Sequence, residues 1–216
     1  MTDRRECAHC GVVFEPRREH ARFCSARCRV AWNRENTGER PARATALGWS
    51  VAAMQDATGR FLRVRAADQT RAFAVIAEAV WWVTIVDATL VRYHPDSYDQ
   101  VLRQRGEQQR QFLEESLGGL RFVRNQMGYH LDAADFICPA HGAAPGARVT
   151  GWRWKPVPEP ALGSLPPSSR EWELARYGAY QASLSGRTVA EVFSPASAFL
   201  REAAAAADPA AGSVPA

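Results

Sequence analysis

The clearest structural signal in this chain is the segment DQTRAFAVIAEAVWWVTIVDATLVRYHP, residues 68–95. Its apolar residues recur at steps of three and four, which places them on one face of an α-helix. Asp68 is suited to cap the start of the helix, and His94-Pro95 ends it because proline cannot continue a helix. The sequence therefore predicts one long, largely buried helix. Its apolar positions are Phe73, Ile76, Ala77, Val80, Val83, Ile85, Val86 and Leu90.

Helical spacing also recurs on the C-terminal side of this stretch. A capping box of Thr188 and Glu191 opens the last helix, in which Pro195 causes a kink or a restart. Residues 138–169 are too rich in proline and glycine for a helix, and we expect a long loop there with one short strand at 148–154. The further predicted helices cover residues 96–105, 107–131, 171–185 and 188–203.

Length and composition limit the class of protein. The chain has 216 residues, of which 46% are hydrophobic and 23% charged, so it can bury one core beside a small module. This composition excludes a disordered or collagen-like chain. No run approaches about 18 consecutive apolar residues, and the first residues lack the apolar core of a signal peptide. We therefore expect a soluble, cytoplasmic protein that does not bind a membrane.

The positive charge is concentrated at the N-terminus. Residues 1–43 hold ten arginines and six acidic residues, whereas the rest of the chain is balanced, so the first fifth carries the whole net charge of +4. A local excess of arginine favours nucleic acid as a partner. Six of these arginines are predicted to bind nucleic acid: Arg17, Arg18, Arg22, Arg27, Arg29 and Arg34.

Four of the five cysteines fall in the same segment, as Cys7-x2-Cys10 and Cys24-x3-Cys28. Two such pairs can supply four thiolates to one tetrahedral Zn²⁺, with Gly11 allowing the first pair to turn. The second pair lies on one face if a helix starts there. Two disulfides are the alternative, but an unexported chain meets a reducing compartment. We predict a structural Zn²⁺ bound by Cys7, Cys10, Cys24 and Cys28.

This cysteine pattern resembles the small treble-clef zinc fingers of many bacterial proteins, over about thirty residues. The resemblance implies metal binding and leaves DNA, RNA and protein open as partners. His9 and His20 could replace a cysteine but are expected to be bystanders. Four thiolates and one Zn²⁺ together carry −2, which lowers the charge of the module to about +2. The arginines could therefore also be solvated residues without a binding role.

A second group of polar residues interrupts the apolar helix predicted over 107–131. Arg124 and Asn125 are adjacent, and His130 follows five residues after Asn125. An arginine can neutralise a phosphodiester, and a histidine can move the proton of a ribose 2′-hydroxyl or of a leaving oxygen. These residue types suffice for RNA cleavage without a metal ion.

This segment resembles the signature of HEPN-domain ribonucleases, an arginine followed by a polar residue and, four to six residues after the arginine, a histidine. The resemblance implies a helical bundle and cleavage by 2′-hydroxyl attack, which leaves a 2′,3′-cyclic phosphate and a 5′-hydroxyl. In this interpretation Arg124 binds the phosphate, His130 is the general base or acid, and Asn125 orients His130 or a phosphate oxygen. It also implies a homodimer in which two copies form one cleft.

On an ideal helix, Arg124 and His130 would not reach the same phosphate. Residues six apart on an ideal helix are rotated by about 120° and separated by about 9 Å. Arg124 and His130 therefore meet at one phosphate only if the helix breaks at Gly128 or if two copies combine their motifs. A structural alternative remains, in which Arg124 pairs with Asp87 or Glu78 and His130 is a helix cap. Trp81 and Trp82 could stack bases, but adjacent residues on a helix point about 100° apart, and one of the two is most simply a core residue.

The sequence thus predicts a mainly α protein with an N-terminal zinc finger and a HEPN-like helical bundle. We expect an endoribonuclease in a toxin or defence role, with RNA as substrate, DNA as a further partner of the finger, and a cognate inhibitor. A non-catalytic nucleic-acid-binding regulator and an adaptor that docks through residues 155–167 are the alternatives. No phosphate-binding loop or nucleophile elbow occurs. The predicted parts are 1–35 (finger), 36–67 (linker and lead-in), 68–205 (helical domain) and 206–216 (disordered tail).

Overall fold

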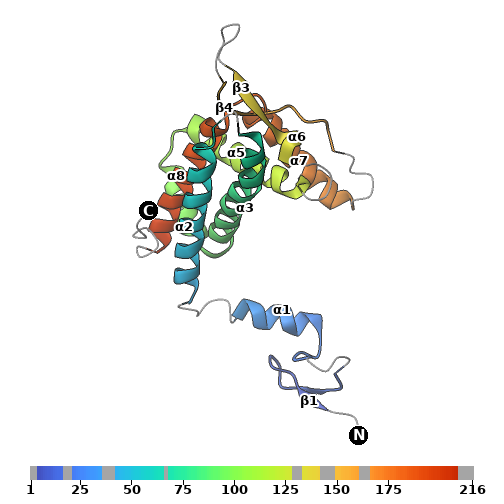
Figure 1. The fold of residues 1–216 in the computed structure, drawn as a ribbon. Coiled ribbons are helices and arrows are strands. Elements are labelled where there is room, and N and C mark those ends of the chain that lie inside the picture. Colours follow the sequence, from blue (N-terminus) through green and yellow to red (C-terminus); the bar gives the residue numbers. More distant parts are fainter. Residues whose placement is uncertain are drawn as a thin grey trace. The chain divides into compact units, whose positions relative to one another are not determined.

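The computed structural model describes residues 4–16, 21–35, 42–65, 68–127, 133–141, 149–160 and 166–208. The chain divides into two compact units, Met1–Ala44 and Thr45–Ala216. The described residues are mainly α-helical, and this confirms the predicted fold class. Figure 1 shows the helices of the larger unit, with the one β-hairpin described there at one end of them.

The N-terminal unit is built around a short hairpin and a helix. Strand β1 (Arg5–Glu6) pairs antiparallel with β2 (Val13–Phe14), and α1 (Ala26–Glu35) follows. Gly11 has a φ of 71°, a left-handed conformation that glycine adopts without strain, and its N–H donates to the Cys7 carbonyl. Among the side chains described in this unit, only Cys7 is a buried apolar group. Apolar packing alone therefore does not hold this unit together.

The helical unit contains seven helices and one two-stranded sheet within its described residues. Its elements are α2 (Ala42–Leu62), α3 (Gln69–Tyr93), α4 (Pro95–Arg103), α5 (Glu107–Gln126), α6 (Ala133–Phe136), β3 (Ile137–His141), β4 (Val149–Trp154), α7 (Pro167–Ser183) and α8 (Val189–Ala207). Helix α5 packs against α7, and α8 packs against α4. Helix α3 contacts α4, α5 and α8, so it lies at the centre of the core.

Helix α3 has the boundaries that its sequence predicts. The Asp68 carboxylate accepts a hydrogen bond from the Arg71 N–H at 3.1 Å and caps the N-terminus. The helix ends before His94, and Pro95 occupies the first position of α4, where a missing N–H costs nothing. Most of its inward-facing residues are apolar and buried, which confirms the predicted core helix, but Ala77, which was predicted on that face, is exposed.

Helix α3 is also the one described helix that is long and apolar enough to cross a membrane by length and composition. It carries a buried ion pair, however. Asp87 is 0% exposed and accepts from the Arg121 Nε at 2.6 Å and from the Tyr98 hydroxyl at 3.1 Å. Burial raises the pKa of Asp87, and the charge of Arg121 opposes this effect. These contacts are those of a core helix packed against α4 and α5.

Residues 42–62 lie within the predicted linker and lead-in, yet they form the long helix α2. The helical unit therefore begins well before residue 68, and the predicted start of that domain is corrected. The physical reason is an apolar face at helical spacing. The glycines at 48 and 59 weaken the helical signal of this segment, but they do not remove that face. The buried residues of this face are Leu47, Val51, Met54, Ala57 and Phe61.

Helix α5 ends at Gln126, and the prediction that it continues to Leu131 is wrong. Met127 closes the helix with an extended backbone (ψ 122°). Helix α8 continues to Ala207, so the first residues of the predicted disordered tail are helical. Residues 209–216 lie outside the described part of the chain.

The described residues of the proline- and glycine-rich region form two strands, where one was predicted. Strands β3 and β4 pair antiparallel, from Ile137 opposite Trp154 to His141 opposite Val149. The hairpin forms because its inward residues, including the fully buried Trp154, pack against the helices. Residues 138–141 of the predicted loop are therefore part of a strand, and α7 starts at Pro167, four residues earlier than predicted.

Gly119 should be intolerant of any side chain, because α5 and α7 approach closely at this point. A Cβ at Gly119 would lie 2.9 Å from the Tyr180 Cα and 2.7 Å from a Leu184 methyl. We expect Gly119→Ala to lower the free energy of unfolding by about 1–3 kcal/mol. Gly178→Ala is the matched control, because it meets no atom within 4 Å and should stabilise α7 by about 0.5–1 kcal/mol. Urea unfolding followed by circular dichroism measures both, and equal effects would contradict the close packing.

Candidate metal centre and polar cluster

The four clustered cysteines come from two places in the N-terminal unit. Cys7 and Cys10 lie in the turn between β1 and β2, where the Cys7 N–H donates to the Val12 carbonyl at 3.0 Å. Cys24 precedes α1, and Cys28 lies in its first turn. Ser25 caps this helix, because its hydroxyl accepts from the Cys28 N–H at 3.2 Å. The cap therefore fixes the start of α1 and, with it, the position of Cys28.

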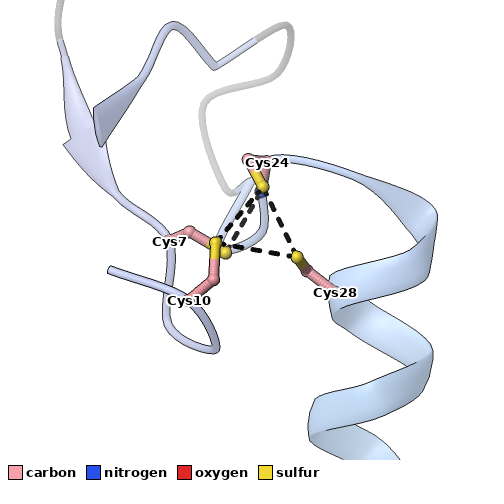
Figure 2. Close-up of side chains that lie close together, drawn as sticks. All are labelled: Cys7, Cys10, Cys24 and Cys28. Carbon is pink, nitrogen blue, oxygen red and sulfur yellow. Dashed lines mark hydrogen bonds between the residues drawn. The ribbon is translucent and has the colours of Figure 1, made fainter. Parts of the chain in front are cut away.

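The sulfur atoms of these cysteines form a compact tetrahedron (Figure 2). The Sγ–Sγ distances are 3.7 Å for Cys10–Cys24, 3.5 Å for Cys24–Cys28 and 3.7 Å for Cys28–Cys10, and all four sulfurs lie within 4.8 Å of one another. A tetrahedral ion with metal–sulfur bonds of about 2.3 Å requires sulfur–sulfur distances of about 3.8 Å. The four cysteines are thus placed to bind one metal ion, as the sequence predicted. All four are free thiols, and the distances exclude disulfide bonds among them in this structure.

The local electrostatics favour thiolates that share a cation. Backbone N–H groups of Cys10 and Cys24 donate to the Cys7 sulfur and lower the pKa of that thiol to about 6. The neighbouring thiols have the opposite effect on Cys24, whose pKa they raise to about 12. A cluster of this kind holds four negative charges only when a cation compensates them.

The basic residues of this unit have different surroundings. Arg22 lies over the Trp32 ring at 5.2 Å and the Phe23 ring at 5.9 Å, so it braces α1 against the segment before it. Arg27 and Arg29 are exposed on α1. Arg17 and Arg18 lie outside the described residues, as does His20, and nothing is described of the Arg34 side chain. His9 is half-buried and is not one of the grouped metal-binding residues.

A second polar group lies at the C-terminal end of α5. We use the name polar cluster for Arg124, Asn125, Gln126, Glu173 and Arg176. Glu173 of α7 is 7% exposed and is the centre of the cluster. Its two carboxylate oxygens accept from the Asn125 amide and the Gln126 amide, both at 3.1 Å, and from the Arg176 guanidinium at 3.2 Å. Sequence reasoning missed Glu173, because the two amides that bind it are almost fifty positions away.

Arg124 lies at the open edge of this cluster. One of its N–H groups contacts the Asn125 Oδ1 at 3.5 Å, and its guanidinium lies 5.8 Å from the centre of the Trp81 ring. Trp81 of α3 is 52% exposed, whereas Trp82 packs against the core. The prediction that one of these two tryptophans belongs to the core is therefore confirmed, and the core residue is Trp82. Arg124 and Trp81 together present a cation and a flat aromatic face to solvent.

The structural alternative for Arg124 is not formed as predicted. Asp87 pairs with Arg121, and Glu78 pairs with Arg60 at 2.6 Å, so neither carboxylate pairs with Arg124. His130 lies outside the described residues, and its position relative to Arg124 is untested.

Glu173 should contribute to stability through its three hydrogen bonds. In Glu173→Gln, one carboxylate oxygen becomes an N–H₂ donor that faces donors, so we expect a loss of about 1–3 kcal/mol in the free energy of unfolding. Glu171→Gln on the exposed side of α7 is the control and should change it by less than about 0.5 kcal/mol. Chemical denaturation measures both. If both variants lower the free energy of unfolding equally, the effect comes from removing a negative charge and not from the hydrogen bonds of the cluster.

Comparisons of this chain with known protein families, with curated protein sequences and with solved structures find no match. The metal centre and the polar cluster are therefore interpreted from their own geometry.

Proposed function

We propose that this protein is a zinc-containing endoribonuclease that cleaves RNA without a catalytic metal ion. The observation that supports the proposal is the pairing of Arg124 with Asn125 at the end of α5. Glu173 fixes Asn125 from α7, and Trp81 lies beside Arg124 from α3. A cation, an amide and an exposed aromatic ring are the groups that bind a phosphodiester and its neighbouring base.

The ion of the N-terminal unit is zinc in this proposal. Four thiolates in a tetrahedron suit Zn²⁺, and with all four positions taken no site remains for water. Zinc therefore has a structural role, and the catalytic chemistry belongs to the helical unit. The exposed Arg27 and Arg29 would contact phosphates, which makes this unit a docking module for RNA or DNA.

The cleavage step needs one cation and proton transfer. Arg124 binds the non-bridging oxygens of the phosphate and stabilises the charge that grows on them. A base removes the 2′-hydroxyl proton, the 2′-oxygen attacks phosphorus, and the bond from phosphorus to the 5′-oxygen breaks as that oxygen gains a proton. His130 is proposed as the base or the acid. The products are a 2′,3′-cyclic phosphate and a 5′-hydroxyl.

Asn125 has a different role here from the one that its sequence suggested. Its amide N–H₂ is held by Glu173, and its oxygen faces Arg124. It is therefore proposed to orient Arg124, which acts on the phosphate. Glu173 is proposed as a positioning residue, because it fixes Asn125 and does not itself contact RNA.

A homodimer is proposed as the active form. Helix α3 exposes small and apolar residues on the side of Trp81, among them Ala77 and Ala88. Two copies that meet near this face would bring two Arg124 side chains to one cleft. Sedimentation equilibrium tests whether the protein is a dimer. If a strictly monomeric protein cleaves RNA, the proposed dimer is wrong.

The test of the function is incubation of the zinc-loaded protein with a mixed RNA pool in a buffer that contains no Mg²⁺ or other added divalent cation. We expect cleavage, with cyclic-phosphate ends identified by mass spectrometry. Tight RNA or DNA binding without cleavage would instead support the non-catalytic regulator. Cleavage that requires added Mg²⁺ would contradict the proposed chemistry, because the 2′-hydroxyl route needs no metal ion.

A further inference from the structure

The four cysteines of the metal centre differ in their access to solvent. Cys7 is 3% exposed and Cys28 is half-buried, whereas Cys10 and Cys24 are exposed. A bound ion covers only the side of each sulfur that faces the centre of the tetrahedron, so the two exposed sulfurs stay open to small molecules in solution. The thiolate is the form of cysteine that reacts with oxidants. Cys10 and Cys24 are therefore the ligands that an oxidant reaches first.

The two exposed sulfurs are also neighbours. The Sγ atoms of Cys10 and Cys24 lie 3.7 Å apart, although one cysteine belongs to the turn between β1 and β2 and the other precedes α1 (Figure 2). A disulfide bond requires about 2.05 Å, so a movement of about 2 Å joins them. Cys24 also lies 3.5 Å from the sulfur of Cys28, which is less exposed. Among the four ligands, Cys10 and Cys24 are the pair in which either sulfur can be oxidised first and the other can then close the bond.

We propose that Cys10 and Cys24 form a site of reversible oxidation by hydrogen peroxide, at which a disulfide replaces two of the four metal ligands. One thiolate attacks a peroxide oxygen, the oxygen–oxygen bond breaks, and a sulfenic acid and a hydroxide ion form. The second thiolate attacks the sulfenic sulfur, and a second hydroxide ion leaves as the sulfur–sulfur bond forms. Two electrons pass from the sulfurs to peroxide, and a thiol reductant reverses the change. The proposal rests on the metal centre and not on RNA cleavage.

Loss of two ligands releases the ion and, with it, the fold of the N-terminal unit. Cys7 and Cys28 remain as thiolates, and two sulfurs do not complete the four-coordinate site that zinc requires. Cys7 is the one buried apolar side chain described in this unit, so packing does not replace the ion. A disulfide between Cys10 and Cys24 constrains a short loop and contributes less than the ion does in zinc-finger peptides. Oxidation therefore switches this unit from a folded to an unfolded state.

Treatment of the zinc-loaded full chain with hydrogen peroxide in small molar excess tests this site. A chromogenic chelator should report release of one zinc ion per chain, and dithiothreitol with added zinc should restore the metal content. Hydrogen exchange should show loss of protection in residues 4–35 as zinc leaves. After the free thiols are alkylated, mass spectrometry of a tryptic digest should identify a disulfide between Cys10 and Cys24 as the first product. Cleavage after Arg27 separates Cys24 from Cys28, and fragmentation distinguishes Cys10 from Cys7 within residues 6–17.

Cys138→Ser is the control, because this half-buried cysteine of β3 is not one of the four grouped ligands. It should release zinc at the same rate as the parent protein and form the same disulfide. The proposal is overturned if the purified protein contains no metal, if zinc stays bound in peroxide, or if the first disulfide joins any other pair. It is also overturned if zinc leaves only as the cysteines become sulfinic or sulfonic acids, because a thiol does not reverse these products. None of these measurements depends on whether the protein cleaves RNA.

Discussion

Cys28→Ser is expected to release the metal ion and to unfold the N-terminal unit while the helical unit stays folded. The reason is the lack of a core, since Cys7 is the one buried apolar side chain described in that unit and Val12 and Val13 are more than half exposed. In zinc-finger peptides the ion contributes about 10–16 kcal/mol, which exceeds what such a small unit gains from packing. Removing one of four ligands should therefore remove the fold.

Cys138→Ser is the matched control for this prediction. Cys138 lies in β3 and is not one of the four grouped cysteines. Elemental analysis should find one metal ion per chain in the parent and in Cys138→Ser, and none in Cys28→Ser. Hydrogen exchange should then show loss of protection in residues 4–35 and unchanged protection in α3 and α5. Full metal content in Cys28→Ser, or a protected N-terminal unit without metal, would contradict the metal centre.

Lowering the pH should release the metal ion and unfold the N-terminal unit, as Cys28→Ser does. The direction of this pH dependence follows from the thiolate ligands. Bound thiolates have pKa values far below those of free thiols, so the stability that the ion gives is present near neutral pH and is lost as the pH falls and protons displace the metal.

The cysteine spacing and α3 were predictable because their signals are local. Cys7 and Cys10, like Cys24 and Cys28, are near neighbours, and a tetrahedral ion requires such pairs. The capping residue, apolar spacing and terminal proline of α3 also lie within one stretch. Most of its buried face was therefore predicted, but no local signal distinguishes Trp81 from Trp82 as the residue that faces solvent.

The parts that were missed depend on contacts between distant residues. Glu173 is a typical surface residue by type, and it is buried only because Asn125 and Gln126 of another helix supply donors. The residues of β3 become a strand by pairing with β4, which no local propensity of a segment with Pro139 indicates. Helix α2 is the exception, because the spacing of Leu47, Val51 and Met54 was a helical signal that its glycines obscured.

Arg124→Ala is expected to lower the RNA cleavage rate by about 10²–10³-fold, the usual cost of removing one charge-stabilising donor from a transition state. The loss should fall mainly on kcat, because the charge on the phosphate oxygens grows as the 2′-oxygen attacks. The fold should be nearly unaffected. The one aromatic contact of Arg124, with the exposed Trp81, accounts for about 0.5–1 kcal/mol.

Arg110→Ala and Arg124→Lys make this prediction specific. Arg110 is an exposed arginine near the start of the same helix, so its removal tests a general loss of positive charge and should change cleavage by less than about twofold. Lysine keeps the charge of Arg124 but cannot form two parallel hydrogen bonds to a phosphate, so Arg124→Lys should retain an intermediate rate. If Arg124→Ala cleaves as fast as Arg110→Ala, the phosphate is bound elsewhere and the polar cluster is structural. If the three variants differ in this order, a planar guanidinium at the end of α5 is the group that the reaction uses.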